Sequence, residues 1–476
     1  MTTRREQVRN NAKYLREVRP LDPEEIAEYV EGQPHPGVVR QLLREEAVDL
    51  EIRERPDGTF VPVGDEPLSV HVDRVDRLPE YAERTLENLL VDAYGPGWPD
   101  GDSGDELRDR IRNVKARYFH GTAVEYDETT ALAYAVYHLP ATYATACYVL
   151  ADLASDDLLP RTLRVLDVGA GVGGPALAVA ELLADAGLVD YTAVEPSAAA
   201  DVLEALFDRT GPNLHASVHR ETAEAFDPGG PYDLILCSNV LSELADPAAV
   251  VGRYLDALAT DGTLAAVAPA DRETATGLRR IERRVEAEYG ATVYAPTVRL
   301  WPGYAPDSTS WSFDVKADLA VPAFQSRLDE GERASTDQDD AAGTGEFVNV
   351  DVQYAFSYLR RDDARRIDFT PDAGRVARMA DMETHVTERI DCVGVKLSHD
   401  LSTDPNANPL FLVGDGSQTV DHFAVRTDAS TLNAPLVEAD YGEFLFFEGA
   451  LVLWNEDEGA YNLVVDGECV VDRQRP

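Results

Sequence analysis

A run of small residues between an expected strand and an expected helix is the part of this sequence best suited to chemistry. Residues 163–168 read as a buried strand, and Gly169, Gly171 and Gly173 follow it directly. Glycine lets a backbone turn tightly and lets a ligand approach it closely. The N-terminus of a helix attracts a negative group. The loop therefore predicts a site for a ligand that carries a negative group.

Two classes of ligand fit this pattern. Gly169, Gly171 and Gly174 satisfy the G-x-G-x-x-G spacing of dinucleotide-binding loops, and Glu195 lies 21 residues further on, where an acid can hold a ribose. However, Asp167 stands two residues before the first glycine, where a carboxylate suits a cationic ligand better than a pyrophosphate. We therefore favour S-adenosylmethionine (SAM) over NAD, and over a fold that has lost its ligand.

Two later segments favour the same choice. The buried strand 232–238 is followed by Asn239-Val-Leu-Ser-Glu-Leu244, which is typical of the substrate edge of methyltransferases. Residues 258–264, Leu-Ala-Thr-Asp-Gly-Thr-Leu, resemble the helix-to-strand turn that class I methyltransferases have at this place. The sequence therefore predicts a class I SAM-binding domain.

Each site residue has an expected role. Glu195, next to Pro196, should accept hydrogen bonds from both ribose hydroxyls, and Asn239 should lie near the methyl group as the catalytic residue. Methyl transfer depends mainly on alignment, so no protein nucleophile is needed. The other predicted cofactor contacts are Asp167, Gly169, Ala170, Gly171 and Gly173 at the methionine end and Glu221 or Thr222 at the adenine.

Plainer roles remain open for some of these residues. Asp167 could cap the turn that follows it, and Asn239 could satisfy loop backbone. Cys237 lies within a buried strand, and we interpret it as a core residue rather than a nucleophile.

The pattern of elements predicts an α/β fold in four parts. Strands and helices alternate over 161–270, which indicates a parallel sheet with helices on both faces, and 348–359 resembles a late strand of that sheet. We expect a winged-helix-like domain (1–75), a helical linker region (76–155), a Rossmann-like class I methyltransferase domain (156–375) and an all-β OB-like domain (380–476). Residues 329–346 are expected to be a loop or disordered.

The N-terminal part reads as three helices followed by a hairpin. Asp22 and Pro23 mark the start of the second helix, and 51–63 form two expected strands around a turn. This winged-helix pattern leaves two interpretations open: contact with nucleic acid through Arg40 and Arg44, or a packing module.

The following segment has its own expected helices. Residues 95–104 read as a linker, and an arginine-rich helix follows, for which a solvated face paired with nearby acids is the favoured interpretation. A long apolar helix over Tyr134–Leu153 is expected to be interrupted at Pro140.

Short apolar strands punctuated by Gly, Asp and Asn recur after residue 380, which predicts an OB-like barrel. The expected strands are 391–396, 410–413, 422–425, 443–447, 451–454 and 462–465. Aromatic side chains there could stack on single-stranded RNA, or they could simply form the core. The rings in question are Phe423, Phe446, Phe447 and Trp454.

Composition limits the setting. The formal net charge is −44, with only four lysines, which favours a cytosol rich in salt, where charges are screened. The four cysteines lie far apart, so neither a metal site nor a disulfide framework is expected. No apolar run is long enough to span a bilayer, and the N-terminus lacks a signal peptide. We expect a cytoplasmic protein without a membrane partner, and the oligomeric state stays open.

The sequence resembles the methyltransferase-like assembly factors of the small ribosomal subunit, best known from mitochondria. The resemblance spans about residues 115–365. It rests on Ala133–Ala144, Leu166–Gly173, Ser238–Leu244 and Gln353–Arg361, which are similar to the family's helix before the first strand, its SAM loop, its segment after the fourth strand and its late Phe-Ser-Tyr strand.

The resemblance implies SAM as cofactor and ribosomal RNA or the small ribosomal subunit as partner. Many family members hold an iron–sulfur cluster through cysteines, but 291–324 contain none here, so no cluster is expected. Arginine pairs at 279–280, 283–284, 360–361 and 365–366 agree with RNA binding, although a salt-bridged surface is equally compatible. We expect a SAM-dependent methyltransferase that acts on or docks to this RNA during ribosome assembly or translation; the alternatives are a non-catalytic SAM-binding assembly factor and a small-molecule methyltransferase.

Overall fold

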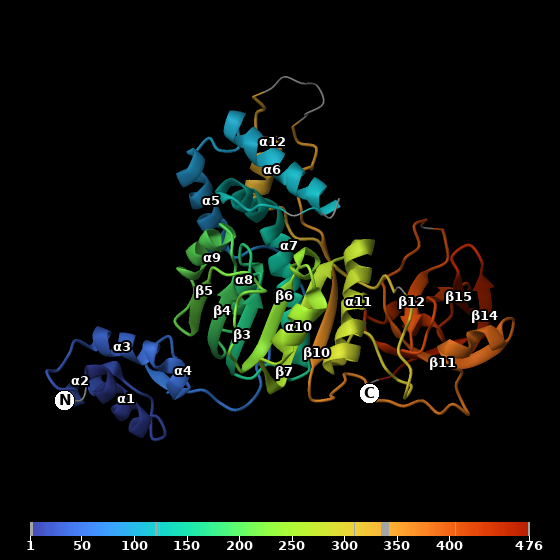
Figure 1. The fold of residues 1–476 in the computed structure, drawn as a ribbon, viewed down its shortest axis with the longest axis horizontal. Coiled ribbons are helices and arrows are strands. Elements are labelled where there is room, and N and C mark those ends of the chain that lie inside the picture. The colour runs from blue at the N-terminus through green and yellow to red at the C-terminus, as the bar shows by residue number, and fades with distance from the viewer. Residues whose placement is uncertain are drawn as a thin grey trace. The chain divides into compact units, whose positions relative to one another are not determined.

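The computed structural model describes residues 3–119, 122, 124–308, 310–334, 342–404 and 406–474. Part of the loop that the sequence predicts over 329–346 lies outside these residues. The chain folds into two units (Figure 1). The first contains Met1–Ser238, Ala257–Gly262 and Ala317–Val352, and the second contains Asn239–Asp256, Thr263–Lys316 and Gln353–Pro476.

The N-terminal part consists of helices and one hairpin, as predicted. Asp22 caps the second helix, where Pro23 takes the first position. Arg40 and Arg44 both form ion pairs with the buried Glu54, with nitrogen–oxygen distances of 3.6 and 2.5 Å. Their role towards nucleic acid stays a prediction. The elements are α1 (Arg4–Leu15), α2 (Pro23–Tyr29), α3 (Pro36–Glu45), α4 (Ala47–Leu50), β1 (Ile52–Glu54) and β2 (Phe60–Pro62).

Three helices, α5 (Glu80–Tyr94), α6 (Gly101–Phe119) and α7 (Glu128–Ser155), lead to the sheet. The predicted linker over 95–104 is too long, because α6 begins at Gly101. The expectation of a solvated face is wrong for Arg108. This guanidinium is fully buried and donates to the carbonyl oxygens of Pro99 and Leu328.

Helix α7 continues through Pro140, so the predicted interruption is wrong. A proline inside a helix leaves the carbonyl four residues earlier without its donor. That carbonyl belongs to Val136, and Nε2 of Gln325 donates to it at 2.8 Å. Gln325 is fully buried on α12 (Ala323–Glu330). Tertiary contact therefore replaces the hydrogen bond that the sequence removes.

Four parallel strands form the part of the sheet that belongs to the first unit, in the order β5-β4-β3-β6. Strand β7 starts in this unit and continues in the second, where β10 pairs with it antiparallel. The complete order is β5-β4-β3-β6-β7-β10-β8, and β9 pairs with β10. The strands are β3 (Thr162–Val168), β4 (Leu188–Val194), β5 (Leu214–His219), β6 (Tyr232–Ser238), β7 (Leu258–Pro269), β8 (Thr292–Ala295), β9 (Asp314–Lys316) and β10 (Val352–Arg360).

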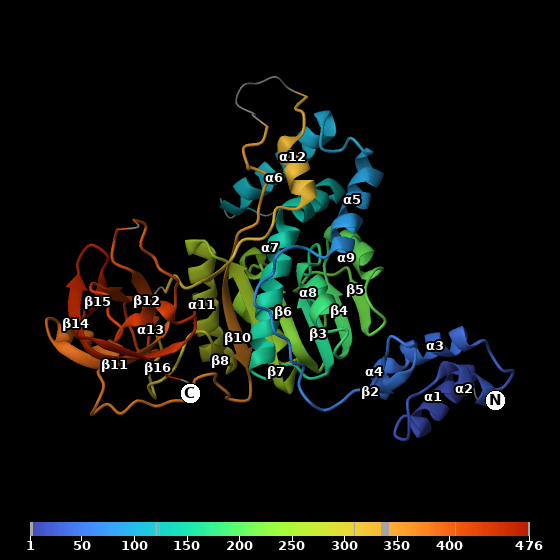
Figure 2. The ribbon, with the colours of Figure 1, turned by 180° about the vertical axis from the view of Figure 1, so that it is seen from behind.

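The strand order reverses at β3, which lies between β4 and β6. In sheets of this kind, ligands bind beyond the carboxyl ends of the strands at such a switch point. Figure 2 shows α7 running beside α8 along the parallel strands. The remaining helices of this region are α8 (Gly174–Leu182), α9 (Ala199–Phe207), η1 (Leu241–Glu243), α10 (Pro247–Leu255) and α11 (Arg272–Tyr289).

The C-terminal part is a closed barrel. The ring β11-β12-β13-β15-β14 closes through pairing of β11 with β14, and β13 runs parallel to β15. This confirms the predicted OB-like barrel. Its elements are η2 (Met379–His385), β11 (Arg389–Lys396), β12 (Leu410–Gly414), β13 (His422–Arg426), α13 (Ala434–Glu438), β14 (Phe444–Asn455), β15 (Ala460–Val465) and β16 (Val470–Gln474).

Two strand predictions for the barrel need correction. The strands expected over 443–447 and 451–454 are one strand, β14, because Gly449 with φ +71° makes a bulge opposite β11 instead of a turn. Strand β16, which pairs with β14, was not predicted.

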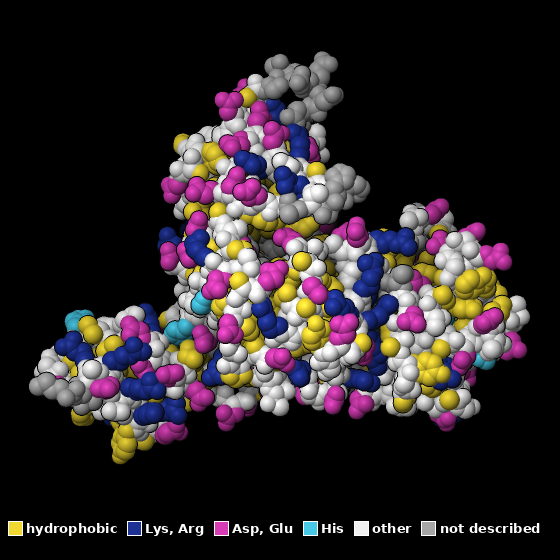
Figure 3. Space-filling view, in the orientation of Figure 1, with side chains coloured by type: hydrophobic (Ala, Val, Ile, Leu, Met, Phe, Trp, Pro, Cys, Tyr) yellow, Lys and Arg dark blue, Asp and Glu magenta, His cyan; other side chains and the backbone are white. Residues whose placement is uncertain are grey.

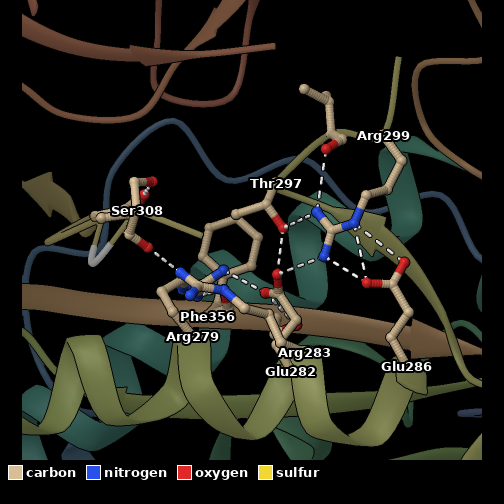
Figure 4. A network of polar contacts seen from close by, with 12 residues as sticks. Arg279, Glu282, Arg283, Glu286, Thr297, Arg299, Ser308 and Phe356 are labelled. Carbon is tan, nitrogen blue, oxygen red and sulfur yellow. Dashed lines mark hydrogen bonds and ion pairs between the residues drawn. The ribbon is translucent and has the colours of Figure 1, made fainter. Parts of the chain in front are cut away.

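A buried ionic network joins α11 to the segment after β8 within the second unit (Figure 4). Glu282 lies between Arg279, at 2.5 Å, and Arg299, at 3.4 Å, and accepts from Ser357 Oγ at 3.0 Å. These side chains are at most 7 % exposed. Although burial opposes it, the two guanidinium groups hold the pKa of Glu282 below its usual range.

Acidic and basic side chains are interspersed over the face seen in Figure 3. The surplus of acid is therefore dispersed on that face rather than gathered in one patch. Within the described ranges, no helix is long and apolar enough to cross a bilayer.

Candidate active site

The glycine loop leaves β3 with three residues in the left-handed region. The φ angles of Gly169, Gly171 and Gly173 are +70°, +53° and +92°, which side chains with a Cβ rarely adopt. A Cβ on Gly171 would meet only the carbonyl oxygen of Gly169, at 4.0 Å. The loop is therefore open on this side, as close approach of a ligand requires.

The last two glycines of the run serve packing. A Cβ on Gly173 would lie 2.7 Å from the side chain of Leu203 in α9. A Cβ on Gly174 would lie 2.3 Å from Oγ1 of Thr142 in α7. Gly174 therefore fixes how closely α7 approaches the start of α8.

Glu195 follows β4 directly and reaches the glycine loop. Its Oε2 accepts the backbone N–H of Gly171 at 2.9 Å, and its Oε1 accepts the backbone N–H and the hydroxyl of Ser197 at 3.0 and 2.5 Å. A carboxylate offers about four lone-pair positions and three donors occupy this one, so one position is left for a ribose hydroxyl. The structure thus brings Glu195, the residue predicted to bind the ribose, together with the predicted glycine loop.

Asp167 ends β3 as a fully buried acid. The Tyr191 hydroxyl donates to its Oδ2 at 2.6 Å, while Oδ1 is buried without a partner among the described residues. Burial raises the pKa of Asp167 to about 7, and Glu195 adds to the rise. An unpaired buried oxygen is costly, so this one is free to meet a donor on a ligand.

The residues predicted at the adenine lie beyond β5. Glu221 and Thr222 are exposed, and the carbonyl oxygen of Thr222 accepts from the backbone N–H groups of Ala225 and Phe226. The backbone N–H of Glu195 donates to the carbonyl of His219 at the end of β5. The contacts of Glu221 and Thr222 with adenine stay predictions, as does that of the exposed Pro196.

Asn239 is the first residue after β6. Its φ of +59° is a left-handed conformation that asparagine tolerates better than most residues. Its backbone N–H donates to the carbonyl of Val267. The role of its side chain in catalysis stays a prediction. Cys237 is fully buried and burial raises the pKa of its thiol, in agreement with a core residue.

A stripe of α7 that the prediction of site residues missed also reaches the loop. Tyr134, His138 and Thr142 are spaced four residues apart, so they share one face of the helix. Thr142 abuts Gly174, and the turn after Glu195 contacts Tyr126, whose carbonyl accepts from Ala198 at 3.3 Å. The i, i+4 spacing of polar rings in an apolar helix was the available signal.

Residues 141–309 match the family model described as a methyltransferase domain. This match covers the glycine loop, Glu195 and the strands β3 to β8, whereas the antiparallel strand β10 lies outside it.

The chain carries a class I SAM-dependent methyltransferase domain.

The residues present fit SAM. The open loop supplies backbone N–H groups and a helix start for the carboxylate of the methionine part, the orphaned Oδ1 of Asp167 suits its ammonium group, and Glu195 suits the ribose. Among the described residues, no group of three or more His, Cys, Asp or Glu side chains could hold a metal ion. SAM is the cofactor of this methyltransferase domain.

The two flanking parts match models of a second family. Residues 5–56 match the N-terminal domain, and residues 380–474 the C-terminal domain, of a domain of unknown function, DUF8157. These matches name no activity. A search of curated proteins gave no match.

Several solved methyltransferases are similar to parts of the chain. A putative O-methyltransferase from Nostoc punctiforme is 16 % identical over 55 % of this chain and 73 % of its own, with a TM-score of 0.27. Magnesium protoporphyrin IX methyltransferase from Synechocystis, with bound SAM, is 16 % identical over 47 % and 91 %, with a TM-score of 0.27. The plantazolicin methyltransferase BpumL is 12 % identical over 59 % and 96 %, with a TM-score of 0.29. At these values no property of the three proteins transfers to this chain.

Proposed function

We propose that the protein is an enzyme that transfers a methyl group from SAM to RNA of the small ribosomal subunit. The observation that supports this best is the combination, in one chain, of a methyltransferase domain with an OB-like barrel, an architecture that commonly binds oligonucleotides. The resemblance to ribosome assembly factors in the helix before β3 and in β10 agrees with the proposal.

Two adjacent rings of the barrel, Trp454 and Tyr461, offer a surface for bases, and the buried His422 packs against Tyr461. Trp454 of β14 pairs in register with Tyr461 of β15, which pairs with His422 of β13. The ring centroids are 4.8 and 5.1 Å apart, and Trp454 is 41 % exposed. Aromatic rings that stack on bases bind single strands with little sequence preference.

Of the other rings named from the sequence, Phe447 is fully buried in one hydrophobic cluster of the barrel. Phe423 and Phe446 are partly buried and pack against a second cluster. Stacking on RNA by the barrel therefore rests on Trp454 and Tyr461.

The charge of the barrel limits how it can hold RNA. The loop 397–409, between β11 and β12, contains Asp400 and Asp404. The loop 456–459, between β14 and β15, contains three acidic residues and a glycine. These loops repel phosphates, so the barrel contributes stacking rather than ionic contact. Screening of this repulsion requires high salt, and RNA binding should accordingly be measured in molar KCl as well as at low salt.

Most of the paired arginines are already engaged. Arg284 binds Asp246 and Glu288, Arg360 binds Asp362, and Arg361 binds Asp256. Among the described residues, Arg272 and Arg280 on α11 have no acidic side chain within ion-pair distance. These two arginines are the phosphate contacts that we favour on α11.

The chemistry demands little of the protein beyond alignment. Bound SAM supplies a methyl group on a positively charged sulfur, and this methyl is displaced by a lone pair of the acceptor while the bonding electrons stay on sulfur. Glu195 and the glycine loop fix the cofactor, and Asp167 places a carboxyl group beside the loop. In model reactions, alignment of the reacting atoms lowers the activation barrier by about 7–11 kcal/mol.

The test is transfer of tritium from labelled SAM to small ribosomal subunits isolated from cells that lack the protein. We expect labelled RNA with the wild-type chain and about tenfold less with Glu195→Ala at limiting SAM, because loss of a buried partner should weaken SAM binding about tenfold. Glu288→Ala, which removes a surface carboxylate, is the matched control and should keep full transfer. Absence of label in RNA, with SAM binding intact, contradicts the proposal.

Two other outcomes have a meaning of their own. Binding of SAM and of the subunit without transfer indicates a non-catalytic assembly factor. Transfer to a small aromatic compound, without any binding to the subunit, indicates a small-molecule methyltransferase, for which the acidic barrel loops are the favouring observation.

A further inference from the structure

A stripe of partly exposed aromatic rings lies along α7. Tyr134, Tyr137 and His138 are only partly buried, in a helix whose other large residues are mostly buried. The centroids of Tyr134 and His138 lie 4.4 Å apart, and those of Tyr137 and His138 4.9 Å apart. These rings therefore form one continuous, partly exposed aromatic surface.

This surface lies between the end of the glycine loop and the turn that follows Glu195. At one end Thr142, one turn after His138, abuts Gly174, and its hydroxyl donates to the His138 carbonyl at 3.0 Å. At the other end the ring of Tyr126 packs edge-on against Tyr134, with centroids 5.5 Å apart. The backbone of Tyr126 accepts the N–H of Ala198, three residues after Glu195. Both ends of the stripe are thus tied to segments that adjoin the predicted SAM-binding residues.

Several contacts hold the stripe in place. Tyr118 and Tyr126 share a hydrogen bond between their hydroxyls at 3.3 Å. Lys115 places its ammonium 4.0 Å from the centre of the Tyr137 ring. Gln325 and Asn349 donate to the carbonyl of Tyr137, at 3.2 and 3.1 Å, on the turn that Pro140 leaves without its usual donor. A rigid surface of this kind suits a binding role.

We propose that Tyr126, Tyr134 and His138 bind the methyl acceptor, and that the acceptor is a planar, uncharged ring, namely a nucleobase turned out of its RNA strand. This inference rests on the proposed function, since it names the part of the enzyme that receives the base.

The chemistry of the stripe favours this class of acceptor. Flipped or single-stranded bases are held by stacking on aromatic side chains and by hydrogen bonds to their edges. Burial lowers the pKa of His138 to about 4, and Lys115 lowers it further. The imidazole is therefore neutral at pH 7, where it has one nitrogen that donates and one that accepts. A neutral imidazole suits the edge of a base better than a phosphate or a carboxylate.

The stripe is distinct from the residues that we expect at the cofactor. Glu195 and the glycine loop take the ribose and the methionine part, and the adenine is expected near Glu221 and Thr222 beyond β5. Loss of the stripe should therefore change binding of the acceptor without changing binding of the cofactor.

The experiment uses the full chain with four variants. Tyr134→Leu and His138→Leu remove a ring, Tyr134→Phe keeps it, and Tyr14→Leu alters a tyrosine that is 78 % exposed on α1. Binding of S-adenosylhomocysteine is measured by calorimetry, and KM and kcat are measured by tritium transfer to small ribosomal subunits. We expect each leucine variant of the stripe to raise KM for the subunit about tenfold, the size expected for one stacked base. Affinity for S-adenosylhomocysteine should stay unchanged in all four variants, and Tyr134→Phe and Tyr14→Leu should behave as wild type.

A second measurement locates the base directly. Subunit RNA that contains 4-thiouridine is crosslinked to the wild-type protein, and the modified peptide is identified by mass spectrometry. A crosslink within residues 124–143 supports the proposal. Weaker binding of S-adenosylhomocysteine by Tyr134→Leu and His138→Leu, with KM unchanged, overturns it, because the rings would then belong to the cofactor site.

Failure of the proposed function gives a different result. If wild-type protein labels no RNA, the same variants are tested on the free nucleosides adenosine and guanosine and on catechol. A tenfold loss with a small planar acceptor keeps the stripe as an acceptor site and removes only the RNA. Equal rates for wild type and leucine variants on every acceptor that is methylated overturn the stripe as well.

Discussion

Tyr191 and Asp167 form a buried pair across two neighbouring parallel strands. The phenol donates to the carboxyl group at 2.6 Å, and both side chains are fully buried. The register of β3 and β4 places Asp167 opposite Ala193, two residues beyond Tyr191, so the tyrosine reaches along the sheet to the acid. The pair links the end of the first strand to the strand that leads to Glu195.

This pair predicts a stability that falls as pH rises. The pKa of Asp167 is raised to about 7 in the folded chain by burial, whereas an unfolded aspartate titrates near 3.9. Below about pH 4 the carboxyl group is protonated in both the folded and the unfolded chain, so it does not change stability. Between pH 4 and 7 the unfolded chain releases the proton, whereas the folded chain must keep it or bury a charge, so stability falls. Asp167→Asn should therefore stabilise β3 by roughly 2–4 kcal/mol at pH 8 and by little at pH 4.

Amide hydrogen exchange of β3 and β4 peptides at both pH values measures this difference. Asp201→Asn, which alters an exposed aspartate on α9, is the control and should show no such change. A gain for Asp167→Asn that is equal at pH 4 and pH 8 would mean that the acid is not protonated in the fold.

The close approach of α7 to α8 predicts a steric cost at Gly174. In Gly174→Ala the new methyl would lie 2.3 Å from Thr142 Oγ1 and 3.0 Å from its carbonyl carbon, so the helices must separate. We expect a loss of about 1–3 kcal/mol, measured by thermal unfolding. Gly277→Ala in α11, where a Cβ meets nothing within 4 Å, should instead stabilise by about 1 kcal/mol. Addition of Thr142→Ala should restore part of the loss, and no restoration would locate the cost elsewhere.

The buried network around Glu282 (Figure 4) predicts a large effect of removing one charge. Glu282→Gln leaves the guanidinium groups of Arg279 and Arg299 buried without their shared acid. Breaking such a pair costs about 3–5 kcal/mol, whereas Glu288→Gln removes only a surface partner of Arg284 and should cost under about 1 kcal/mol. Urea unfolding followed by the fluorescence of Trp301 and Trp311 compares the two variants. Equal midpoints would contradict the prediction.

The same network sets a limit at low pH. Because the pKa of Glu282 is lowered in the folded chain, its contribution is present above the unfolded pKa and is lost as pH falls through the folded value. Acid unfolding of the wild type should therefore be steeper than that of Glu282→Gln.

The proline in α7 predicts a dependence on Gln325. Gln325→Leu leaves the carbonyl of Val136 buried without a donor, which should cost about 1–3 kcal/mol. In the background Pro140→Ala the helix regains the missing N–H, so the same change should cost less. A double-mutant cycle of thermal unfolding measures the coupling, and additive effects would show that Gln325 acts through something other than this carbonyl.

Much of the first half of the sheet was predictable because its signals are local. The strand 232–238 and the helix start at Asp22 agree with the structure residue for residue, since buried strands and capped helices are determined by nearby side chains. The glycine loop and Glu195 were assigned to one site because parallel strands bring their carboxyl ends to the same edge.

Predictions that failed depended on partners distant in the chain. The continuation of α7 through Pro140 depends on Gln325, 185 residues away from the proline. The burial of Arg108 depends on a carbonyl at Leu328. The bulge at Gly449 that keeps β14 in one piece depends on pairing with β11. None of these partners lies within the range of a local pattern.

The sequence by itself indicated the cofactor class, because three spaced glycines after one strand and an acid at the end of the next are requirements that residue type and spacing satisfy. Only the tertiary structure decided that this face of α7 meets the start of α8, where Thr142 abuts Gly174. Helical spacing places Tyr134, His138 and Thr142 on one face, but which element that face meets depends on Gly174, whose missing Cβ lets two helices come into contact.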